Sequence, residues 1–318
     1  MRRGISMVVE TLGDLIATLG SIDDDEIDWQ NIRQATVLIQ QTFRYDYPGP
    51  ITDLRQRLIV VPPDWHGHQR LATHKLRVSG CNLECERSYD SFGNVVLDLT
   101  LEEVESHVEF TTWAVVECQI PSDGSQSPDD IGFDRRFGEP SRLTRPDEAL
   151  RAVAAELRAS GAGDLDLAAL VCSRVHDHFA YEWGVTSVET TAAEAWAGAR
   201  GVCQDYAHCM VALCRLCDLP ARYVSGHLLG DGGTHAWVEV LLADAAGADI
   251  AVAFDPTHNR RAGPRYVTVA VGRDYGDVPP TSGTFEGPYP GVLTTHKRAA
   301  VVRVEYLQPT RRRRIARD

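Results

Sequence analysis

Hydrophobic and polar positions along this chain follow two different periods. In the first part, short runs rich in apolar and β-branched residues lie between clusters of Pro, Gly and Asp, which is the pattern of strands joined by turns. The runs predicted as strands are 37–43, 55–61, 74–78, 94–99, 107–112 and 114–118. Six or seven short strands in succession predict a β-sandwich.

Helical periodicity replaces this pattern after position 145. The predicted helices are 146–159, 165–179, 191–197 and 203–219. Thr144 or Asp147 is expected to cap the first helix, because Thr and Asp side chains accept hydrogen bonds from exposed N–H groups at a helix start. Thr190 or Thr191 is expected to cap the third in the same way. The fourth helix is apolar on most of its surface, which predicts that it is buried.

Strands return in the last third of the chain. Residues 235–242 and 250–255 are apolar and β-branched, and a turn of small residues separates them, so they predict a β-hairpin. Residues 266–271 and 300–306 are predicted to close the same sheet. Helices followed by a hairpin-rich sheet are typical of an α+β domain.

The sequence therefore predicts two domains with terminal and connecting segments. These are an N-terminal helical extension 1–34, a β-sandwich 35–120, a linker 121–144, an α+β core 145–306 and a basic tail 307–318. The extension opens with apolar residues at helical spacing, interrupted by Glu10 and Asp14, which indicates an amphipathic helix rather than a signal peptide. The four arginines at 311–314 are interpreted as a solvated tail, with an interaction patch as the alternative.

Composition narrows the class of partner. The chain has 318 residues, 43% of them hydrophobic, which is enough for two buried cores. A formal net charge of −13 and a pI near 5.3 argue against binding to nucleic acid or to an anionic membrane. No run approaches the roughly 20 apolar residues of a membrane span. We expect a small or peptide-like substrate, with a mild preference for positively charged ones.

The eight cysteines do not suggest a disulfide framework. Half of them crowd into 203–217, where a helix offers poor pairing geometry, so we expect free thiols and a cytoplasmic location. Cys214 and Cys217 have zinc-like spacing but lack a second ligand pair nearby. Cys81 and Cys85, with His66 and His68, are the other candidate metal ligands, and incidental placement in loops is the preferred interpretation. The sequence predicts no metal and no cofactor.

The candidate chemistry centres on Cys203. This thiol follows a glycine turn and begins the buried helix, where the positive end of the helix dipole favours a thiolate. A structural cysteine explains this segment alone equally well. His235 opens one strand of the predicted hairpin and Asp255 ends the other, so the two side chains can lie side by side and face the thiol. Nucleophile, base and orienting carboxylate then follow in chain order.

Four blocks carry a resemblance to a known family. They are Gly-Val-Cys-Gln-Asp-Tyr-Ala-His (201–208), Leu-Pro-Ala-Arg-Tyr-Val-Ser-Gly (219–226), Thr-His-Ala-Trp-Val-Glu-Val (234–240) and Phe-Asp-Pro-Thr (254–257). In this order they resemble the transglutaminase-like branch of the papain-like cysteine enzymes. Segments 272–280 and 92–96 are similar to the bacterial members that carry an N-terminal β-domain. The resemblance spans about residues 35 to 305 and implies a papain-like transglutaminase core behind a β-sandwich.

The resemblance also implies roles for residues around the triad. An aromatic side chain some thirty residues before the cysteine helps stabilise the oxyanion in transglutaminases, and Tyr181 or Trp183 stands there. The backbone N–H of Cys203 is expected to be the main oxyanion donor. His208 is characteristic of this bacterial group and is assigned a supporting role rather than that of the base. Gln204 and Asp205 begin the same helix, where packing and catalysis explain them equally well, and Trp237 is a core residue by default.

The expected reaction is cysteine-dependent acyl transfer from a peptide or protein amide through a thioester. Hydrolysis by a protease or amidase is preferred, because superfamily members outside the dedicated cross-linkers are often hydrolases. One alternative is protein-glutamine gamma-glutamyltransferase activity, since the same triad serves it. The others are an inactive scaffold that keeps the fold for binding, and an arylamine N-acetyltransferase-like acyl carrier.

Overall fold

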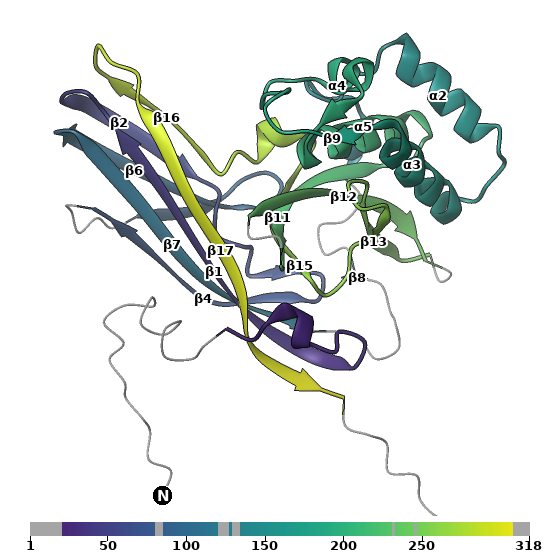
Figure 1. The fold of residues 1–318 in the computed structure, drawn as a ribbon, viewed down its shortest axis with the longest axis horizontal. Helices are drawn as coiled ribbons and strands as arrows, with labels where there is room; N and C mark the ends of the chain where they lie inside the picture. The colour runs from purple at the N-terminus through teal and green to yellow at the C-terminus, as the bar shows by residue number, and fades with distance from the viewer. Residues whose placement is uncertain are drawn as a thin grey trace, which may run out of the picture.

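The computed structural model describes residues 21–79, 85–119, 127–128, 134–230, 233–244 and 247–307. Two β-sheets face each other as a sandwich, and a third sheet with helices over one face packs beside them (Figure 1). The predicted amphipathic helix near the N-terminus, Cys81 and the Arg-rich tail lie outside the described residues. From residue 21, the predicted helical extension contains a 3-10 turn, η1 (Asp24–Glu26), and then the start of the first strand.

The sandwich consists of a five-stranded and a four-stranded sheet. The strand order of the first sheet is β17 (Val292–Tyr306), β1 (Ile32–Asp46), β7 (His107–Gln119), β4 (Gln69–Val78) and β3 (Trp65–His66). The strand order of the second sheet is β16 (Thr281–Glu286), β2 (Ile51–Leu58), β6 (Val95–Val104) and β5 (Glu86–Tyr89). Alternate residues of β2 are buried, because one face of each sheet packs on the other sheet. Phe43, Leu54 and Phe110 belong to the core between them.

Two predicted strands are one in the structure. The runs 107–112 and 114–118 form a single strand, β7, because Trp113 continues the ladder and pairs with Gln40 of β1 and Lys75 of β4. The remaining predicted runs of the first half lie within or next to β1, β2, β4 and β6.

The last strand corrects the predicted domain boundary. β17 pairs antiparallel with β1, from Val292 opposite Asp46 to Tyr306 opposite Ile32. The prediction that 300–306 closes the sheet of the α+β core was therefore wrong, whereas 266–271 does join it. An alternating strand pattern specifies which face is buried but not which sheet the strand joins, because every sheet edge presents the same unpaired N–H and C=O groups.

The α+β core follows the sandwich in the chain. Its sheet has the order β14 (Arg260–Arg261), β13 (Asp249–Asp255), β12 (Thr234–Ala243), β11 (Ala221–Leu228), β15 (Tyr266–Gly272), and β8 (Ser127–Pro128) also pairs with β13. The helices on one face are α2 (Glu148–Arg158), α3 (Asp164–His178), α4 (Ala192–Gly198) and α5 (Cys203–Leu216) (Figure 1). Asp147 caps α2, and Thr191 caps α4 in a reciprocal capping box with Glu194. The buried α5 packs against α2, α3, α4 and the sheet, as its apolar sequence predicted.

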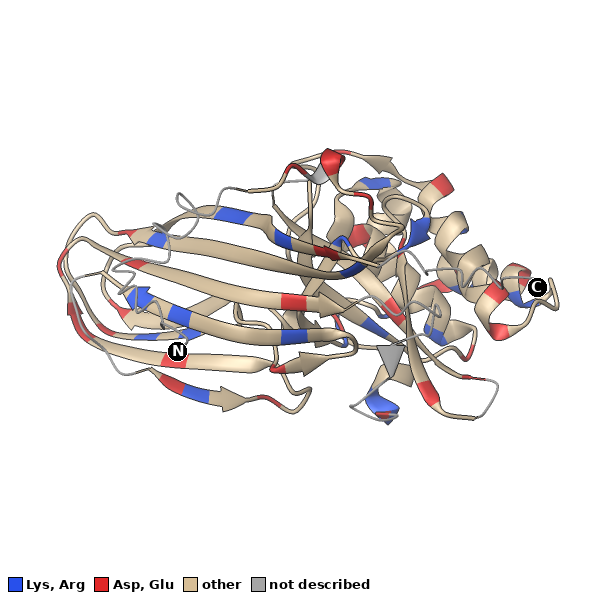
Figure 2. Ribbon diagram, turned by 90° about the horizontal axis from the view of Figure 1, so that it is seen from below, with Lys and Arg blue, Asp and Glu red and all other residues tan. Residues whose placement is uncertain are grey.

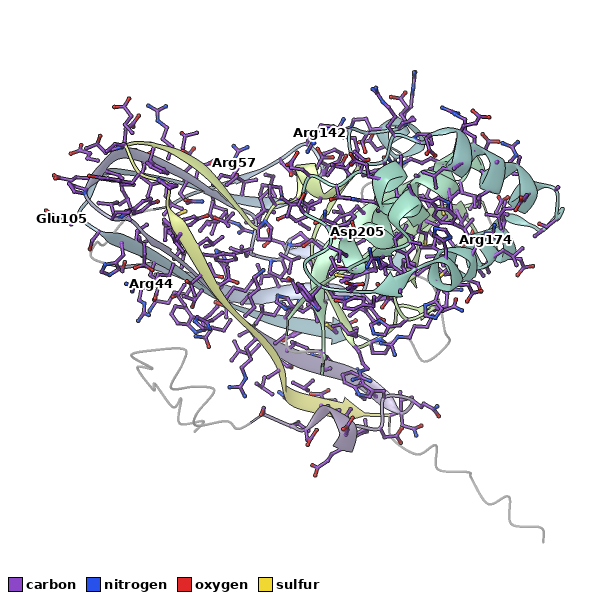
Figure 3. The ribbon with its side chains drawn as sticks, turned by 45° about the horizontal axis from the view of Figure 1, so that its top comes forward. Arg44, Arg57, Glu105, Arg142, Arg174 and Asp205 are labelled. Carbon is purple, nitrogen blue, oxygen red and sulfur yellow. The ribbon has the colours of Figure 1, made fainter. Side chains whose placement is uncertain are left out.

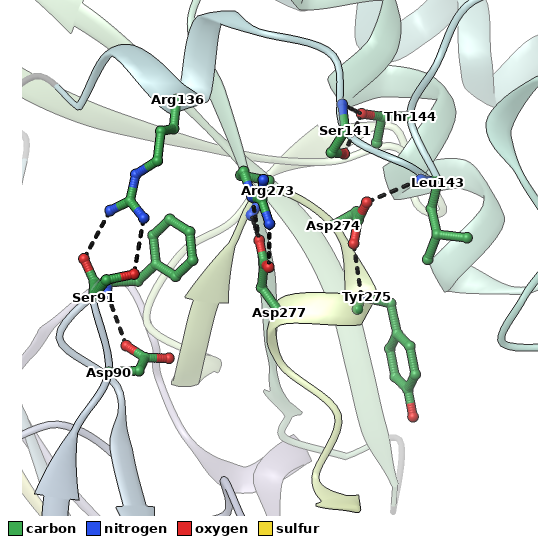
Figure 4. A network of polar contacts seen from close by, with 12 residues as sticks. Asp90, Ser91, Arg136, Ser141, Leu143, Thr144, Arg273, Asp274, Tyr275 and Asp277 are labelled. Carbon is green, nitrogen blue, oxygen red and sulfur yellow. Dashed lines mark hydrogen bonds and ion pairs between the residues drawn. The ribbon is translucent and has the colours of Figure 1, made fainter.

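A polar network ties the core to the sandwich (Figure 4). Arg136, in η2 (Arg135–Gly138), donates to Ser91 of the sandwich at 2.8 Å. Asp274 accepts hydrogen bonds from the backbone N–H of Leu143 at 3.0 Å and of Gly276 at 2.8 Å. The segment 272–280, part of the resemblance, contains η3 (Tyr275–Asp277) and is held to the sandwich at both ends. Asn94 Nδ2 donates to the Val271 carbonyl at 2.7 Å, and the Ile59 N–H donates to the Pro280 carbonyl at 3.0 Å.

Charged residues of both signs are interspersed over both domains (Figure 2). Figure 3 places Arg44, Arg57 and Glu105 on the surface of the sandwich, whereas Asp205 lies in the interior. None of the helices in the described part of the chain is long and apolar enough to cross a membrane.

Candidate active site

Cys203 is the first residue of α5, and a carboxylate two positions later holds this helix start. Asp205 Oδ2 accepts a hydrogen bond from the Val202 N–H at 2.8 Å and from the Thr186 hydroxyl at 2.7 Å. Gly201 makes room for this carboxylate, because a Cβ at position 201 would lie 2.4 Å from Asp205 Oδ2. The glycine and the acid of the Gly-Val-Cys-Gln-Asp block thus work together to cap the helix that presents the thiol.

His235 and Asp255 come together as the hairpin pattern predicted. They lie on the neighbouring antiparallel strands β12 and β13, and His235 Nε2 is 2.8 Å from Asp255 Oδ2. Cys203 lies close enough to the imidazole to raise the pKa of His235, and both residues line the same cleft. Because Nε2 is bound to the carboxylate, Nδ1 is the ring nitrogen left for the thiol. The structure therefore brings the three predicted residues together, with a hydrogen bond between His235 and Asp255 and with Cys203 beside the imidazole.

Asp255 is fully buried and surrounded by donors. Its carboxylate accepts from Tyr266 Oη at 2.6 Å, from His258 Nδ1 at 2.7 Å and from the Thr257 N–H at 2.9 Å, in addition to His235. Burial alone would raise the pKa of Asp255, but the hydrogen bonds and the charge of His235 outweigh burial and lower it. The group is therefore a permanent anion that orients its neighbours.

The sequence analysis did not identify Tyr266 or His258 as part of the site. His258 follows Asp255 by three positions, so the extended block Asp-Pro-Thr-His carried a local signal for it. Tyr266 comes from β15, and its hydroxyl also accepts a hydrogen bond from Arg260 Nε at 2.8 Å. No local pattern indicates that this tyrosine reaches Asp255, because the contact depends on how the sheet is ordered.

The electrostatics of His235 favour the imidazolium form. Burial acts to lower the pKa of His235, but the interactions with Asp255 and Cys203 are stronger together and raise it to about 9. An imidazolium next to a thiol stabilises the thiolate, which is the form of cysteine that attacks a carbonyl.

We expect His235 to remain protonated up to about pH 9, as followed by NMR titration of its ring protons. The pKa of His235 in the folded protein lies above its ordinary value of 6.5. The contribution of the imidazolium to the free energy of unfolding is therefore complete below about pH 6.5 and is lost as the pH rises through about 9. This shift in pKa corresponds to about 3 kcal/mol of stabilisation of the protonated form of His235 by the folded protein. Cys203→Ala should lower the midpoint, because it removes one of the groups that raise it. A midpoint near 6.5 in the parent protein would contradict the proposed ion pair.

A short parallel bridge places Tyr181 beside the start of α5. β9 (Ala180–Tyr181) pairs with β10 (Arg200–Gly201), so Tyr181 is opposite Gly201, two residues before Cys203. Trp183 is more exposed, at 78%, and its ring centre is 6.3 Å from that of Tyr181. Both residues line the same cleft as Cys203. Their part in oxyanion stabilisation stays a prediction.

The cleft has a volume of about 960 Å³ and is open to solvent on one side. Its lining residues are Tyr181, Trp183, Cys203, Gly233, Thr234, His235, Thr257, His258, Thr295, His296 and Lys297. The last three belong to β17, so the sandwich supplies one wall of the cleft and the core supplies the rest. Sequence reasoning missed this wall, because it assigned the end of the chain to the other sheet.

The residues with predicted supporting roles lie around this centre. Gln204 Nε2 is 3.4 Å from the carbonyl oxygens of Ser187 and Val188 and so holds the preceding loop. His208 is fully buried, and its Nε2 accepts from the Tyr275 N–H at 3.1 Å, which joins α5 to η3. Burial lowers the pKa of His208 to about 4, so it is neutral. Trp237 packs edge-on against Tyr266 at 5.3 Å and supports the partner of Asp255.

One group of potential metal ligands occurs in the described part of the chain. The ligand atoms of His235, Asp255 and His258 lie within 4.8 Å of one another. Both imidazoles, however, stand 2.7–2.8 Å from the same carboxylate oxygen, which is the geometry of N–H donors. A metal would have to replace both hydrogen bonds, so the donor set fits an orienting network better than a coordination site.

Comparisons with known proteins agree with this geometry. Residues 151–250 match the transglutaminase-like superfamily, and residues 37–117 match the bacterial transglutaminase-like N-terminal region. An uncharacterized protein of Mycobacterium tuberculosis is 28% identical over 264 residues, which cover 75% of this chain and 84% of that protein. An uncharacterized protein of Mycobacterium leprae is 35% identical over 114 residues, or 33% of this chain and 39% of that protein.

A solved structure has the same fold. It is that of a candidate cysteine protease from Cytophaga hutchinsonii, with a TM-score of 0.68 and 22% sequence identity. The similarity covers 86% of this chain and 93% of that one, so the combination of β-sandwich and α+β core extends through both proteins.

Proposed function

The chain belongs to the transglutaminase-like superfamily and carries the bacterial N-terminal region, and from this premise we propose that it is a cysteine enzyme that hydrolyses amide bonds. The observation that carries the proposal is the ring of His235, which is hydrogen-bonded to Asp255 and lies beside Cys203 in the same cleft. Cys203 and His235 line a cleft large enough for a peptide segment. The substrate class is therefore a peptide or protein amide.

The reaction proceeds in two halves. The thiolate of Cys203 attacks the amide carbon, and the backbone N–H of Cys203, at the helix start, stabilises the negative charge that develops on the oxygen. The imidazolium of His235 then donates its proton to the leaving amine, and a thioester remains on Cys203. In the second half, His235 takes a proton from water and the resulting hydroxide attacks the thioester. The carboxylic acid is released, and the Cys203 thiolate is regenerated beside the His235 imidazolium. Asp255 holds the ring throughout, with Nδ1 towards the sulfur.

The charge of the cleft favours water over an amine as the acceptor. A cross-linking enzyme must bring a second, usually protonated, amine to the thioester, and a carboxylate would help to bind it. Among the described residues that line the cleft, none is Asp or Glu, whereas Lys297 and three histidines are present. Asp255 lies behind His235 with none of its surface exposed. This supports hydrolysis, with gamma-glutamyl transfer as the second candidate.

One incubation distinguishes the reactions. A glutamine-bearing protein is incubated with the enzyme and a labelled primary amine, and the products are analysed by mass spectrometry. Peptide cleavage identifies a protease, ammonia release without label identifies an amidase, and incorporated label identifies a transferase. If a broad panel of such substrates gives none of the three products, the inactive scaffold becomes the better explanation.

Alkylation tests the nucleophile independently of substrate. Iodoacetamide at neutral pH should modify Cys203 before the other cysteines. Burial raises the pKa of the remaining described thiols, to about 12 for Cys118 and Cys172. Cys85 is the matched comparison, since it is also half-buried but lies near Asp98 and Glu86, and its pKa is raised. A time course by peptide mass spectrometry decides, and faster labelling of Cys85 would argue against the assignment.

We further propose that the protein acts in a reducing compartment such as the cytoplasm. The seven cysteines in the described part of the chain are all free thiols, and free, unpaired cysteines are typical of reducing environments.

A further inference from the structure

Lys297 lies on the wall of the cleft that the C-terminal strand supplies. It is a residue of β17, opposite Gln41 of β1, and its side chain is partly buried. Nζ is 3.3 Å from the hydroxyl of Thr234, the residue before His235, and 5.4 Å from the ring centre of Phe43. The ammonium group thus reaches from the sandwich to the strand that carries the candidate base.

This ammonium group has no carboxylate partner among the residues that the structure describes. The situation is unusual in a chain with 45 acidic and 32 basic residues. Most described arginines near the surface pair with Asp or Glu, as Arg57 does with Asp98 and Arg70 with Glu117. A partly desolvated cation without a counter-ion costs free energy, and an incoming anion would recover it.

The remaining polar residues of the cleft that the structure describes add no negative charge. Three histidines, His235, His258 and His296, line it together with Lys297, and neutral threonines complete the polar surface. Burial lowers the pKa of Lys297, and interaction with Cys203 opposes that effect, which indicates that the amine and the sulfur are within electrostatic reach. The net charge of the whole chain favours positively charged substrates, whereas Lys297 favours a negatively charged group at this wall of the cleft.

Resting on the proposed function, we propose that Lys297 forms a carboxylate-binding subsite, so that the enzyme prefers amide substrates with a carboxylate next to the bond it cleaves. The ammonium group would bind the carboxylate by a charge-assisted hydrogen bond, with the Thr234 hydroxyl as a second donor. The carboxylate can be the C-terminus of a peptide or the side chain of an acidic residue. The subsite is built by the sandwich, which would explain why the chain returns to that domain in its last strand.

A pair of alkylating reagents tests this subsite without any knowledge of the substrate. Iodoacetate and iodoacetamide attack the same thiolate by the same displacement of iodide, but only iodoacetate carries a carboxylate. We expect Lys297→Met to lower the ratio of the iodoacetate rate to the iodoacetamide rate at Cys203 by about tenfold, because one charge interaction in the cleft is lost. Lys297→Arg should retain most of the ratio.

Arg298→Met is the matched control. It removes the same charge one residue along the same strand, where the side chain is exposed and points to the opposite face. Its ratio should equal that of the parent. Circular dichroism and thermal melting show whether each variant is folded, and the ratio is taken within one folded protein, so a partial loss of stability does not affect it.

The outcomes separate the two proposals. If Lys297 only stabilised the thiolate, both rates would fall together in Lys297→Met and the ratio would stay constant, which would overturn the subsite but not the nucleophile. If neither reagent modifies Cys203 in the folded parent, the nucleophile assignment fails and the subsite fails with it. An unchanged ratio with rapid labelling by both reagents leaves the hydrolase proposal intact and rejects Lys297 as an anion receptor.

The source of the carboxylate is identified with substrate pairs. Peptides that turn over are compared with a free and an amidated C-terminus, and with Glu or Gln beside the cleaved bond. In one of the two pairs, we expect the enzyme to prefer the member that carries the carboxylate, which is the free C-terminus or Glu. In Lys297→Met this preference should disappear, because the KM for that member rises. Equal turnover of both members of both pairs by the parent enzyme would contradict the proposal.

Discussion

Cys203→Ala should abolish turnover while leaving the fold intact. Cys203 lines the cleft, whereas the other two thiols of α5, Cys209 and Cys214, are fully buried. In a serine hydrolase with a similar triad, the loss of the nucleophile costs about six powers of ten in kcat. The side chain is only partly buried at the first position of the helix, so the substitution leaves no large cavity. Initial rates on any substrate found in the screen, together with a thermal melt, measure both effects.

The control for this variant lies at the other end of the same helix. Cys217 is the C-cap residue of α5 and is buried, with 6% of its surface exposed. Cys217→Ala should lower the free energy of unfolding by about 1 kcal/mol, because it leaves a small cavity, and should retain full activity. Turnover by Cys203→Ala at the parental rate would assign the reaction to another group and refute the mechanism.

Asp255→Asn should lower kcat/KM by two to four powers of ten, less than Cys203→Ala. In a serine triad this exchange costs about four powers of ten, because the amide holds the imidazole in the wrong tautomer. A cysteine needs its base less, since the thiol ionises more readily than a hydroxyl. His235, His258 and Tyr266 all donate to the carboxylate, so the NH2 group of Asn would face at least one of these donors and leave it without an acceptor. We therefore expect the free energy of unfolding to fall by about 1–3 kcal/mol.

Tyr266→Phe provides the graded comparison for Asp255. It removes one donor to the carboxylate and leaves the bond to His235, so its effect on kcat/KM should be within about tenfold. Parental activity of Asp255→Asn on a substrate that Cys203→Ala cannot turn over would exclude Asp255 from the mechanism. Glu239 is the acidic residue on the same strand as His235, but it could not take the place of Asp255. It is already paired with Arg222 at 2.7 Å and with His66 at 2.9 Å.

The local parts of the candidate site were available in the sequence. The glycine turn before Cys203, the apolar run after it and the caps Asp147 and Thr191 involve residues close together in the chain, and short-range geometry determines them. The same holds for His235 and Asp255, since a hairpin aligns its two strands wherever it packs. The α+β core and the sandwich before it followed from these patterns and from the resemblance.

The long-range parts depended on the tertiary structure. Tyr266 reaches Asp255 because β15 lies next to β11 in the folded sheet, and Lys297 reaches the cleft because β17 pairs with β1. Backbone hydrogen bonding between strands is the same for every sequence, so an apolar alternation does not encode which edge a strand will join. Only the packing of the two domains makes the last strand a wall of the cleft. The same packing places the charge of Lys297 where a substrate would bind.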